Sequence, residues 1–415
     1  MGYSSPVKIE ITGMGIITSI GQTIADFQSA LLAAKTQFGY LKRPGRKGSK
    51  LFIGAELPDI NAQSKLPEYS GLLRSASWST QIATMAVSEA WQDAKLSSYQ
   101  FNPERIGIIV GGSNFQQRYQ QQIWERYQSR PQFLRPTYGI TLWDTDLMGL
   151  LSECFQIQGE GYSVGGASAS GAISIIHAAR QIQMGITDIS IAVAPLFDIS
   201  QWECQGFMNL GAMGSERFSA NPNLACRPFD KDHDGFIYGE GCGVVVLEKA
   251  AHAQQRGVTS YGELIGWSHI LDGERGPKPS QKGEERAINN ALTMAKLQPE
   301  QIDYVNTHGT SSPMGDKTEV AALKCVGLSH CLINATKSLT GHCVTAAGIV
   351  EFIATLLQMK AGFCHPTHNL LNPVDITLNW VRQTAVEAQI NYAISNSFAF
   401  GGINAALVIG KSRRD

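Results

Sequence analysis

Apolar and polar positions along the chain show two periodicities, one typical of helices and one typical of strands. Apolar residues that recur at three- and four-residue spacing predict helices with one buried face, and short runs that are apolar throughout or alternate predict buried strands. The predicted strands are 7–18, 105–112, 188–195, 244–250, 262–267, 302–310 and the run that begins at Ile390; the predicted helices are 24–36, 73–95, 284–296 and 348–360, with one more after Ser168.

The second half of the chain repeats the order of the first. The strand at 262–267 resembles the opening strand, and the helix at 348–360 resembles the one after Ser168. A strand–helix order that occurs twice predicts duplicated α/β units around mixed sheets. At 415 residues the chain is long enough for two such units with a sizeable core.

Composition excludes several classes of protein. A hydrophobic content of 43% with 17% charged residues is ordinary for a globular protein, and the net charge of −1 argues against nucleic acid as the main partner. We find no apolar run near the roughly 20 residues of a membrane span, and the N-terminus lacks the pattern of a secretory signal. We therefore expect a cytoplasmic protein that does not contact membranes.

The cysteines and histidines do not form a metal motif. The eight cysteines include no C-x-x-C pair, so we expect reduced, mostly buried thiols. His365 and His368 have no cysteine or carboxylate cluster nearby, which favours a surface turn over a zinc site. No metal ion is expected.

Residues 41–50 (LKRPGRKGSK) form a basic segment with a proline and two glycines. Such a run favours a solvated, mobile loop. A docking surface for an acidic partner is the alternative interpretation.

The chain is organised around residues 159–185. A short extended run, Gly161 to Val164, leads through Gly165 and Gly166 into the predicted helix with buried positions 172, 175, 176, 179 and 182. Two adjacent glycines allow a sharp turn, and Ser168 would lie at its apex, where helix N–H groups favour an oxyanion. An acyl-transfer enzyme places its nucleophile at such a position. The alternative is that Ser168 and Ser170 are helix N-caps, and this stretch alone does not decide between them.

Further motifs carry a family resemblance. They are ITGMGIITSIG at 11–21, RPFDKDHDGFIYGEGCGVVVLEKA at 227–250, YVNTHGTSSPMGD at 304–316, NATKSLTGHCVTAAG at 334–348 and NSFAFGGIN at 396–404. In order and over nearly the whole chain, the sequence resembles the β-ketoacyl-ACP synthases and polyketide ketosynthases of the thiolase superfamily. The resemblance implies a five-layered αβαβα fold of two duplicated halves, 1–255 with Ser168 and 256–415 with His308, His342 and Phe400, and usually a homodimer.

The same resemblance assigns candidate site residues. His308 and His342 match the two catalytic histidines of the family, Lys337 matches its active-site lysine, and Glu351 matches the glutamate that pairs with this lysine. The resemblance places four further residues near the substrate carboxylate and the oxyanion: Thr310, Ser312, Phe400 as a gate, and Gly401 beside it. Turn formation for the hydroxyls, and core packing for Phe400, are the structural alternatives.

The sequence departs from the family at one decisive position. The family carries a catalytic cysteine in a T-A-C-(S/T/A)-S-G motif, whereas this chain reads GASASG, with Ser168 in place of the cysteine. A serine hydroxyl has a far higher pKa than a thiol, and a helix dipole contributing about 1 kcal/mol does not make it an alkoxide at neutral pH. The acyl-accepting group is therefore lost, while the decarboxylation residues remain.

These features predict decarboxylation of malonyl-ACP to acetyl-ACP and CO₂ without condensation. The chain resembles the serine-bearing decarboxylative ketosynthases of β-branching cassettes in bacterial polyketide pathways. That resemblance implies an acyl carrier protein as partner, a substrate on its phosphopantetheine arm, no other cofactor, and an HMG-synthase-like enzyme downstream.

Two alternatives remain open. One is a condensing enzyme that uses Ser168 as nucleophile with a positioned base. The other is a silent subunit similar to the chain-length factors, which lack the cysteine and usually the histidines too. The presence of both His308 and His342 favours an active enzyme.

Overall fold

The computed structural model describes residues 7–46, 51–214 and 216–412. Ten strands form one mixed sheet in the order β11-β10-β14-β15-β9-β1-β8-β6-β4-β5. The first half of the chain supplies β1 (Ile9–Thr18), β4 (Ile106–Gly111), β5 (Gly161–Val164), β6 (Ile189–Ala194) and β8 (Gly241–Lys249). The second half supplies β9 (Gly262–Leu271), β10 (Tyr304–Asn306), β11 (Leu332–Asn334), β14 (Tyr392–Ala399) and β15 (Ile403–Gly410).

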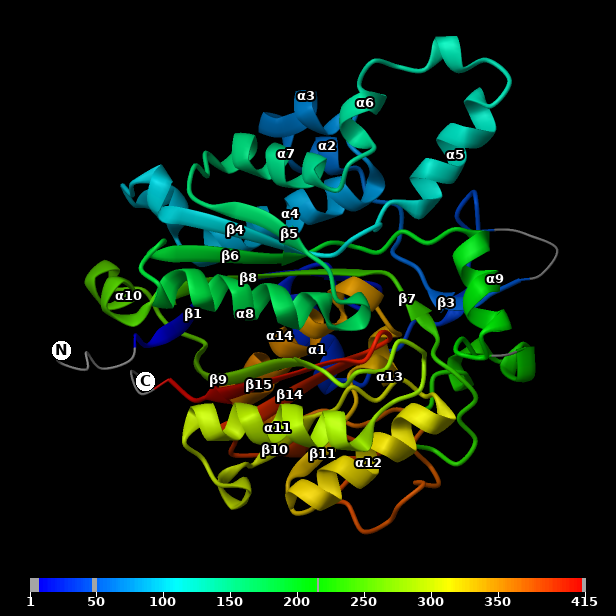
Figure 1. The fold of residues 1–415 in the computed structure, drawn as a ribbon, viewed down its shortest axis with the longest axis vertical. Coiled ribbons are helices and arrows are strands. Elements are labelled where there is room, and N and C mark those ends of the chain that lie inside the picture. The colour runs from blue at the N-terminus through cyan, green and yellow to red at the C-terminus, as the bar shows by residue number, and fades with distance from the viewer. Residues whose placement is uncertain (1–6, 47–50, 215, 413–415) are drawn as a thin grey trace.

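The two sets of five strands are joined by one short contact, and helices cover them in layers. Only Glu10 and Ile11 of β1 pair with β9, opposite Glu263 and Gly262. The main helices are α1 (Ile24–Leu32), α4 (Trp78–Asp93), α7 (Thr145–Phe155), α8 (Ser170–Gln183), α11 (Gln281–Ala295), α12 (Pro313–Val326) and α14 (Ala347–Ala361). Helices α8 and α14 lie between the two half-sheets, α4 and α7 cover one outer face, and α11 and α12 cover the other (Figure 1). This is the five-layered αβαβα thiolase fold that the family resemblance implies.

Smaller elements surround this core. They are α2 (Ala62–Lys65), α3 (Ser70–Leu73), α5 (Gln117–Tyr127), α6 (Tyr138–Thr141), α9 (Gln201–Asn209), α10 (Ala250–Arg256), α13 (Lys337–Thr340), and a three-stranded sheet of β2 (Gly39–Tyr40), β3 (Ile53–Ala55) and β7 (Tyr238–Gly239).

The two central helices are reached through equivalent turns. A short 3₁₀ turn precedes each: Ala167–Ala169 before α8 and Val344–Ala346 before α14, and the first residue of each turn has a positive φ, 45° for Ala167 and 49° for Val344. Four residues later each helix has a glycine, where an added Cβ would lie 2.8 Å from the backbone N of Ile349 (Gly171) or 2.6 Å from that of Ala172 (Gly348). Only glycine allows the two helices to approach so closely. The duplication therefore brings two strained turns, one from each half, to the same point.

The predicted elements differ from the structure mainly at their ends. The helix predicted at 24–36 ends at Leu32, and the one predicted at 73–95 begins at Trp78, because the Ser77 side chain accepts the backbone N–H of Thr80 and caps α4 there. Gly165 and Gly166 are not in the left-handed region as the sharp turn suggested; Ala167 takes that conformation. Gly166 is required for space, since an added Cβ would lie 2.3 Å from Cδ1 of Ile173.

The described part of the basic segment, residues 41–46, is not the solvated loop that its composition favoured. Arg46 is fully buried, and its guanidinium forms ion pairs of 2.8 Å with Glu56, Asp198 and Glu240. Arg43 also pairs with Glu240, at 3.0 Å. Asp198 and Glu240 come from distant segments, so the composition around Arg46 could not reveal these partners. Residues 47–50 of the same segment lie outside the described residues.

Two further expectations need correction. His365 does not lie in a surface turn: its ring is buried, and its Nε2 is 3.0 Å from Oγ1 of Thr336. Residues 344–361 are long and apolar enough to span a membrane, whereas we expected no such run from the sequence. In the structure 89% of this segment is buried inside the protein, where it forms α14 and the turn before it.

All eight cysteines are free thiols, and seven of them are buried.

Candidate active site

Ser168 lies in the turn between β5 and α8, at the predicted apex. Neither Ser168 nor Ser170 caps α8: the residue at the cap is Ala169, and it makes no side-chain cap bond. The Ser170 hydroxyl instead holds the turn, because it accepts the N–H of Gly166 and donates to the carbonyl of Ala167. The N-cap alternative is therefore wrong, and the Ser168 hydroxyl is free to face the neighbouring cavity.

His342 is the nearest neighbour of Ser168. Its Nε2 lies 2.9 Å from Oγ of Ser168, and its Nδ1 accepts the backbone N–H of Val344 at 3.2 Å. An Nδ1 that accepts is unprotonated, so the proton of the neutral ring resides on Nε2. Burial lowers the pKa of His342 well below 6.5, and the positive charge of Lys337 lowers it further. His342 is thus a neutral imidazole whose Nε2–H donates toward Ser168.

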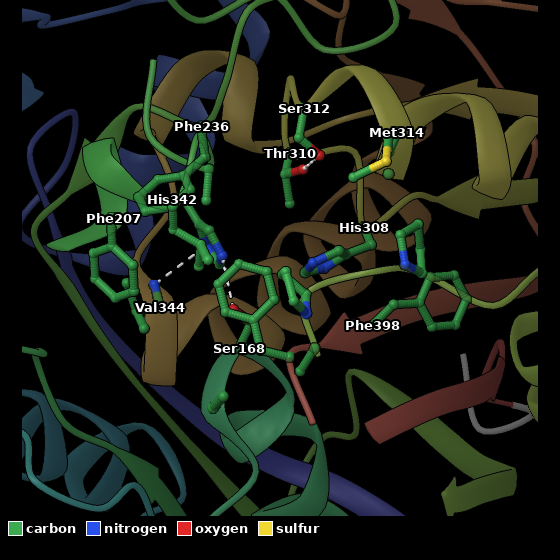
Figure 2. A pocket seen from close by; sticks show the side chains of 18 of the residues that line it. Ser168, Phe207, Phe236, His308, Thr310, Ser312, Met314, His342, Val344 and Phe398 are labelled. Atoms are coloured by element: carbon green, nitrogen blue, oxygen red, sulfur yellow. Dashed lines mark hydrogen bonds between the residues drawn. The ribbon is translucent and has the colours of Figure 1, made fainter. Parts of the chain in front are cut away.

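His308 has the same arrangement, built from other elements. The Lys337 ammonium donates to its Nδ1 at 3.2 Å, which again leaves the ring proton on Nε2. Burial, then Lys337 and then His342 lower the pKa of His308 well below 6.5. The two rings stand nearly perpendicular with centroids 5.6 Å apart, and Figure 2 shows both reaching the same space above Ser168. The site therefore presents two neutral N–H donors side by side.

Lys337 and Glu351 support the two histidines on the side away from Ser168. Lys337 is 1% exposed, and its ammonium also donates to the backbone carbonyl of His308 and to Oε1 of Glu351. Burial raises the pKa of Glu351 to about 7, and the attraction of Lys337 opposes that shift. A buried ammonium beside both histidines disfavours protonation of either ring, which keeps them as donors.

The cavity in front of the histidines has a volume of about 470 Å³. Ser168, both histidines, Thr310, Ser312 and Phe400 line it, as the sequence predicts. The hydroxyls of Thr310 and Ser312 lie 2.8 Å apart. An apolar wall completes the space, with Phe197, Phe207, Leu210, Phe236 and Val344 among its members.

The structure does not bring every predicted residue into that cavity. Lys337 and Glu351 act from behind the histidines, and Gly401 is absent from the described residues that line the cavity. Gly401 instead allows the turn between β14 and β15, with φ of 85°. Among residues 7–46, 51–214 and 216–412, no group of three or more His, Cys, Asp or Glu side chains could hold a metal ion.

Sequence reasoning missed two buried carboxylates at the site. Glu319 on α12 accepts the backbone N–H groups of His308 and Gly309, each at 2.8 Å, and thereby fixes the His308 turn. Glu284 on α11 lines the cavity and is 2% exposed. Glu284 stands beside Glu285 at the start of a predicted helix, and Glu319 lies in a segment for which no helix is predicted. Neither position gives a signal before the helices are packed.

Family profiles and related sequences match the chain over most of its length. The family profile for the β-ketoacyl synthase N-terminal domain matches residues 7–253, and that for the C-terminal domain matches residues 261–371. The chain is 46% identical over 402 residues to the polyketide biosynthesis malonyl-ACP decarboxylase PksF of Bacillus subtilis, which covers 97% of this chain and 96% of the relative. It is 31% identical to 3-oxoacyl-[acyl-carrier-protein] synthase 2 of Coxiella burnetii, over 97% of this chain and 98% of the relative.

Solved structures of ketosynthases have the same fold as this chain. A β-ketoacyl synthase from Burkholderia phymatum superimposes with a TM-score of 0.86 at 29% identity, over 98% of this chain and all of that one. The ishigamide ketosynthase/chain length factor gives a TM-score of 0.88 at 27% identity with the same coverage. A β-ketoacyl synthase and a ketosynthase/chain-length-factor assembly thus share this fold, so the fold alone does not decide the activity.

Proposed function

The chain belongs to the β-ketoacyl synthase family, and from that premise we propose that it decarboxylates malonyl-ACP to acetyl-ACP and CO₂ without condensing the product. The observation that carries this function is the pair of neutral imidazoles, His308 and His342, whose Nε2–H groups face one cavity beside a serine. The malonyl-ACP decarboxylase relative supports the same assignment.

Each part of the cavity has a role in the reaction. The malonyl thioester oxygen binds between the two Nε2–H donors, and Thr310 and Ser312 supply hydroxyls for the malonyl carboxylate. As the bond to the carboxylate breaks, its electron pair forms the enolate and the negative charge collects on the thioester oxygen. Donors held in place for that charge lower the barrier, each by about 3 to 4 kcal/mol. A proton then adds to the α-carbon and gives the acetyl thioester.

The geometry disfavours Ser168 as an acylated nucleophile. Serine hydroxyls need a base that takes the proton, as in the catalytic triad. His342 is the nearest candidate, but its Nδ1 is occupied by the N–H of Val344 and its low pKa opposes a second proton. The Ser168 oxygen accepts from His342 instead of losing a proton to it. The condensing alternative therefore lacks its base.

The hypothesis of a catalytically silent subunit does not explain why a lysine and a glutamate are buried together behind the histidines. A buried Lys337–Glu351 pair is expensive to desolvate and is weak as a stability device. Here it holds His308 and keeps both rings uncharged, a role that only a working site requires.

The partners follow from the substrate. The malonyl group arrives on the phosphopantetheine arm of an acyl carrier protein, and the acetyl-ACP product would pass to an HMG-synthase-like enzyme. A cytoplasmic homodimer is part of the same proposal: among the strands that the structure describes, β5 pairs with β4 alone and forms an edge of the ten-stranded sheet. An open edge of this kind can pair with a second copy.

The test is incubation of the purified protein with malonyl-ACP, followed by mass spectrometry of the carrier arm. Acetyl-ACP should accumulate at the rate of CO₂ release. Unchanged malonyl-ACP would refute the decarboxylase assignment, and a β-ketoacyl-ACP would establish the condensing alternative.

A further inference from the structure

We propose that Glu284 is the proton donor of this site: its carboxylic acid delivers the proton that converts the enolate into the acetyl group. This inference rests on the proposed function, which creates an enolate and names no source for its proton. Glu284 lines the same cavity as His308, His342 and Ser168, on the side formed by α11.

The Glu284 side chain is buried with no polar group to satisfy it. The residue is 2% exposed, and its Oε2 has no hydrogen-bond partner among the described residues. A buried carboxylate without a partner is too costly to persist, so the group takes a proton instead. A neutral carboxyl that lines a cavity and donates to no protein atom is available to donate to a substrate.

The charges around Glu284 favour the same protonation state. Burial raises the pKa of Glu284 well above 4.5, and the carboxylates of Glu319, Asp272, Asp316 and Glu285 raise it further. The cationic side chain that lines the cavity on this side is the exposed Lys278. Carboxylic acids kept neutral by burial are established general acids in other enzymes.

Glu319 cannot fill this role, although burial raises its pKa to about 7. Its Oε1 accepts the N–H of His308 and its Oε2 accepts that of Gly309, so both oxygens are occupied in holding the turn. Glu284 differs because it makes no such bond. Asp272, the third carboxyl that lines the cavity, accepts the backbone N–H of Glu274 and the side-chain amide of Asn404, so Glu284 is the free donor.

The proposed step balances. The bond between the α-carbon and the carboxylate breaks, CO₂ leaves, and the electron pair remains in the enolate. The O–H bond of Glu284 then breaks as a C–H bond forms at the α-carbon, and the thioester carbonyl is restored. The Glu284 carboxylate recovers its proton from water that enters the cavity, so that no oxidant or reductant takes part.

The proton donor can be tested by measuring the ratio of two products that form from the same enolate. This ratio does not depend on which step limits the overall rate. The Ser168→Cys protein supplies a thiol that hexanoyl-ACP can acylate, so an enolate formed from malonyl-ACP is either protonated or captured by the acyl thioester. Removal of the proton donor by Glu284→Gln should raise the ratio of 3-oxooctanoyl-ACP to acetyl-ACP at least about tenfold, at the low end of general-acid effects. Glu285→Gln, which removes a carboxylate one residue away, should leave the ratio unchanged.

A second measurement keeps the Ser168 background. In an equal mixture of H₂O and D₂O, the hydrogen-to-deuterium ratio in the acetyl methyl group reports the atom that donates. Glu284→Gln should change this ratio, and Glu284→Leu serves if the glutamine variant does not fold. The proposal is overturned if the Glu284 variants give the same product ratio as Ser168→Cys in the first experiment and the same isotope ratio as the unaltered protein in the second. Failure of the unaltered protein to make acetyl-ACP would instead refute the proposed function itself.

Discussion

Nε2 of His342 lies 2.9 Å from Oγ of Ser168, in the position where a condensing enzyme of this family has its thiol. The other nitrogen of the ring accepts the N–H of Val344, which fixes the proton on Nε2. In this contact the imidazole therefore donates and the Ser168 hydroxyl accepts. A catalytic serine–histidine pair needs the reverse, with the hydroxyl donating to the imidazole. Decarboxylation without condensation follows from that direction.

Alanine at either histidine should remove most of the activity. Each substitution deletes one donor to the enolate oxygen, and loss of such a donor lowers the rate by about 10² to 10³. The measurement is CO₂ release from malonyl-ACP by His308→Ala and His342→Ala. His330→Ala is the matched control, because His330 is exposed on the outer surface. Full activity in both site variants would show that the donors have been assigned wrongly.

Ser168 should matter much less than the histidines. In Ser168→Ala the two Nε2–H donors remain, so decarboxylation should fall by less than about tenfold, well short of the loss of one donor. Steady-state rates beside the histidine variants make the comparison. Ser168→Cys, in contrast, should become acylated by acyl-ACP, which intact-protein mass spectrometry detects. A loss in Ser168→Ala as large as in the histidine variants is incompatible with a spectator hydroxyl.

Lys337 and Glu351 should behave as a unit. Lys337→Met leaves Glu351 buried without its cation, and breaking a buried pair costs about 3 to 5 kcal/mol of folding free energy. The double variant Lys337→Met/Glu351→Leu removes both charges and should recover most of that stability in thermal or urea unfolding. It should not recover activity, because Nδ1 of His308 has lost its donor. Recovered activity in the double variant would mean that the lysine has a purely structural role.

The site was only partly predictable from the chain. The two histidines, the lysine and the serine lie in motifs with glycines and hydroxyls at fixed spacing, and the resemblance of these motifs to those of the β-ketoacyl synthases identifies them. Arg46 and Glu284 carry no such signal: a basic loop and an acidic residue in the first turn of a helix are ordinary patterns. Their burial arises from segments far away in the sequence: those that carry Asp198 and Glu240 for Arg46, and α12 and β15, against which α11 packs, for Glu284.

Low pH should switch the enzyme off only well below the usual histidine range. His308 and His342 donate as neutral rings, and their pKa values are lowered well below 6.5. Activity is therefore present above the lowered values and is lost as the pH falls through them, so that it persists at about pH 6, where an ordinary histidine is largely protonated. The check is a pH–rate profile of acetyl-ACP formation. A half-point near the ordinary histidine value would show that the rings are not held neutral.

The turn that carries His308 should depend on Glu319. Glu319→Gln replaces one acceptor oxygen with an NH₂ group, which cannot accept the N–H of His308 or Gly309. An unsatisfied buried N–H costs about 1 to 3 kcal/mol, so unfolding free energy should fall by this amount and the decarboxylation rate should fall with it. Urea unfolding and CO₂ release measure the two effects. Unaltered stability and rate would exclude this support.

The most direct test of the account offers the unaltered protein both substrates at once. The protein is incubated with hexanoyl-ACP and malonyl-ACP, and the masses of protein and carrier are followed through many turnovers. We expect acetyl-ACP to accumulate, hexanoyl-ACP to persist, and the protein mass to stay unchanged. A hexanoyl ester on the protein, or 3-oxooctanoyl-ACP among the products, would contradict the claim that His342 donates to Ser168 and does not activate it.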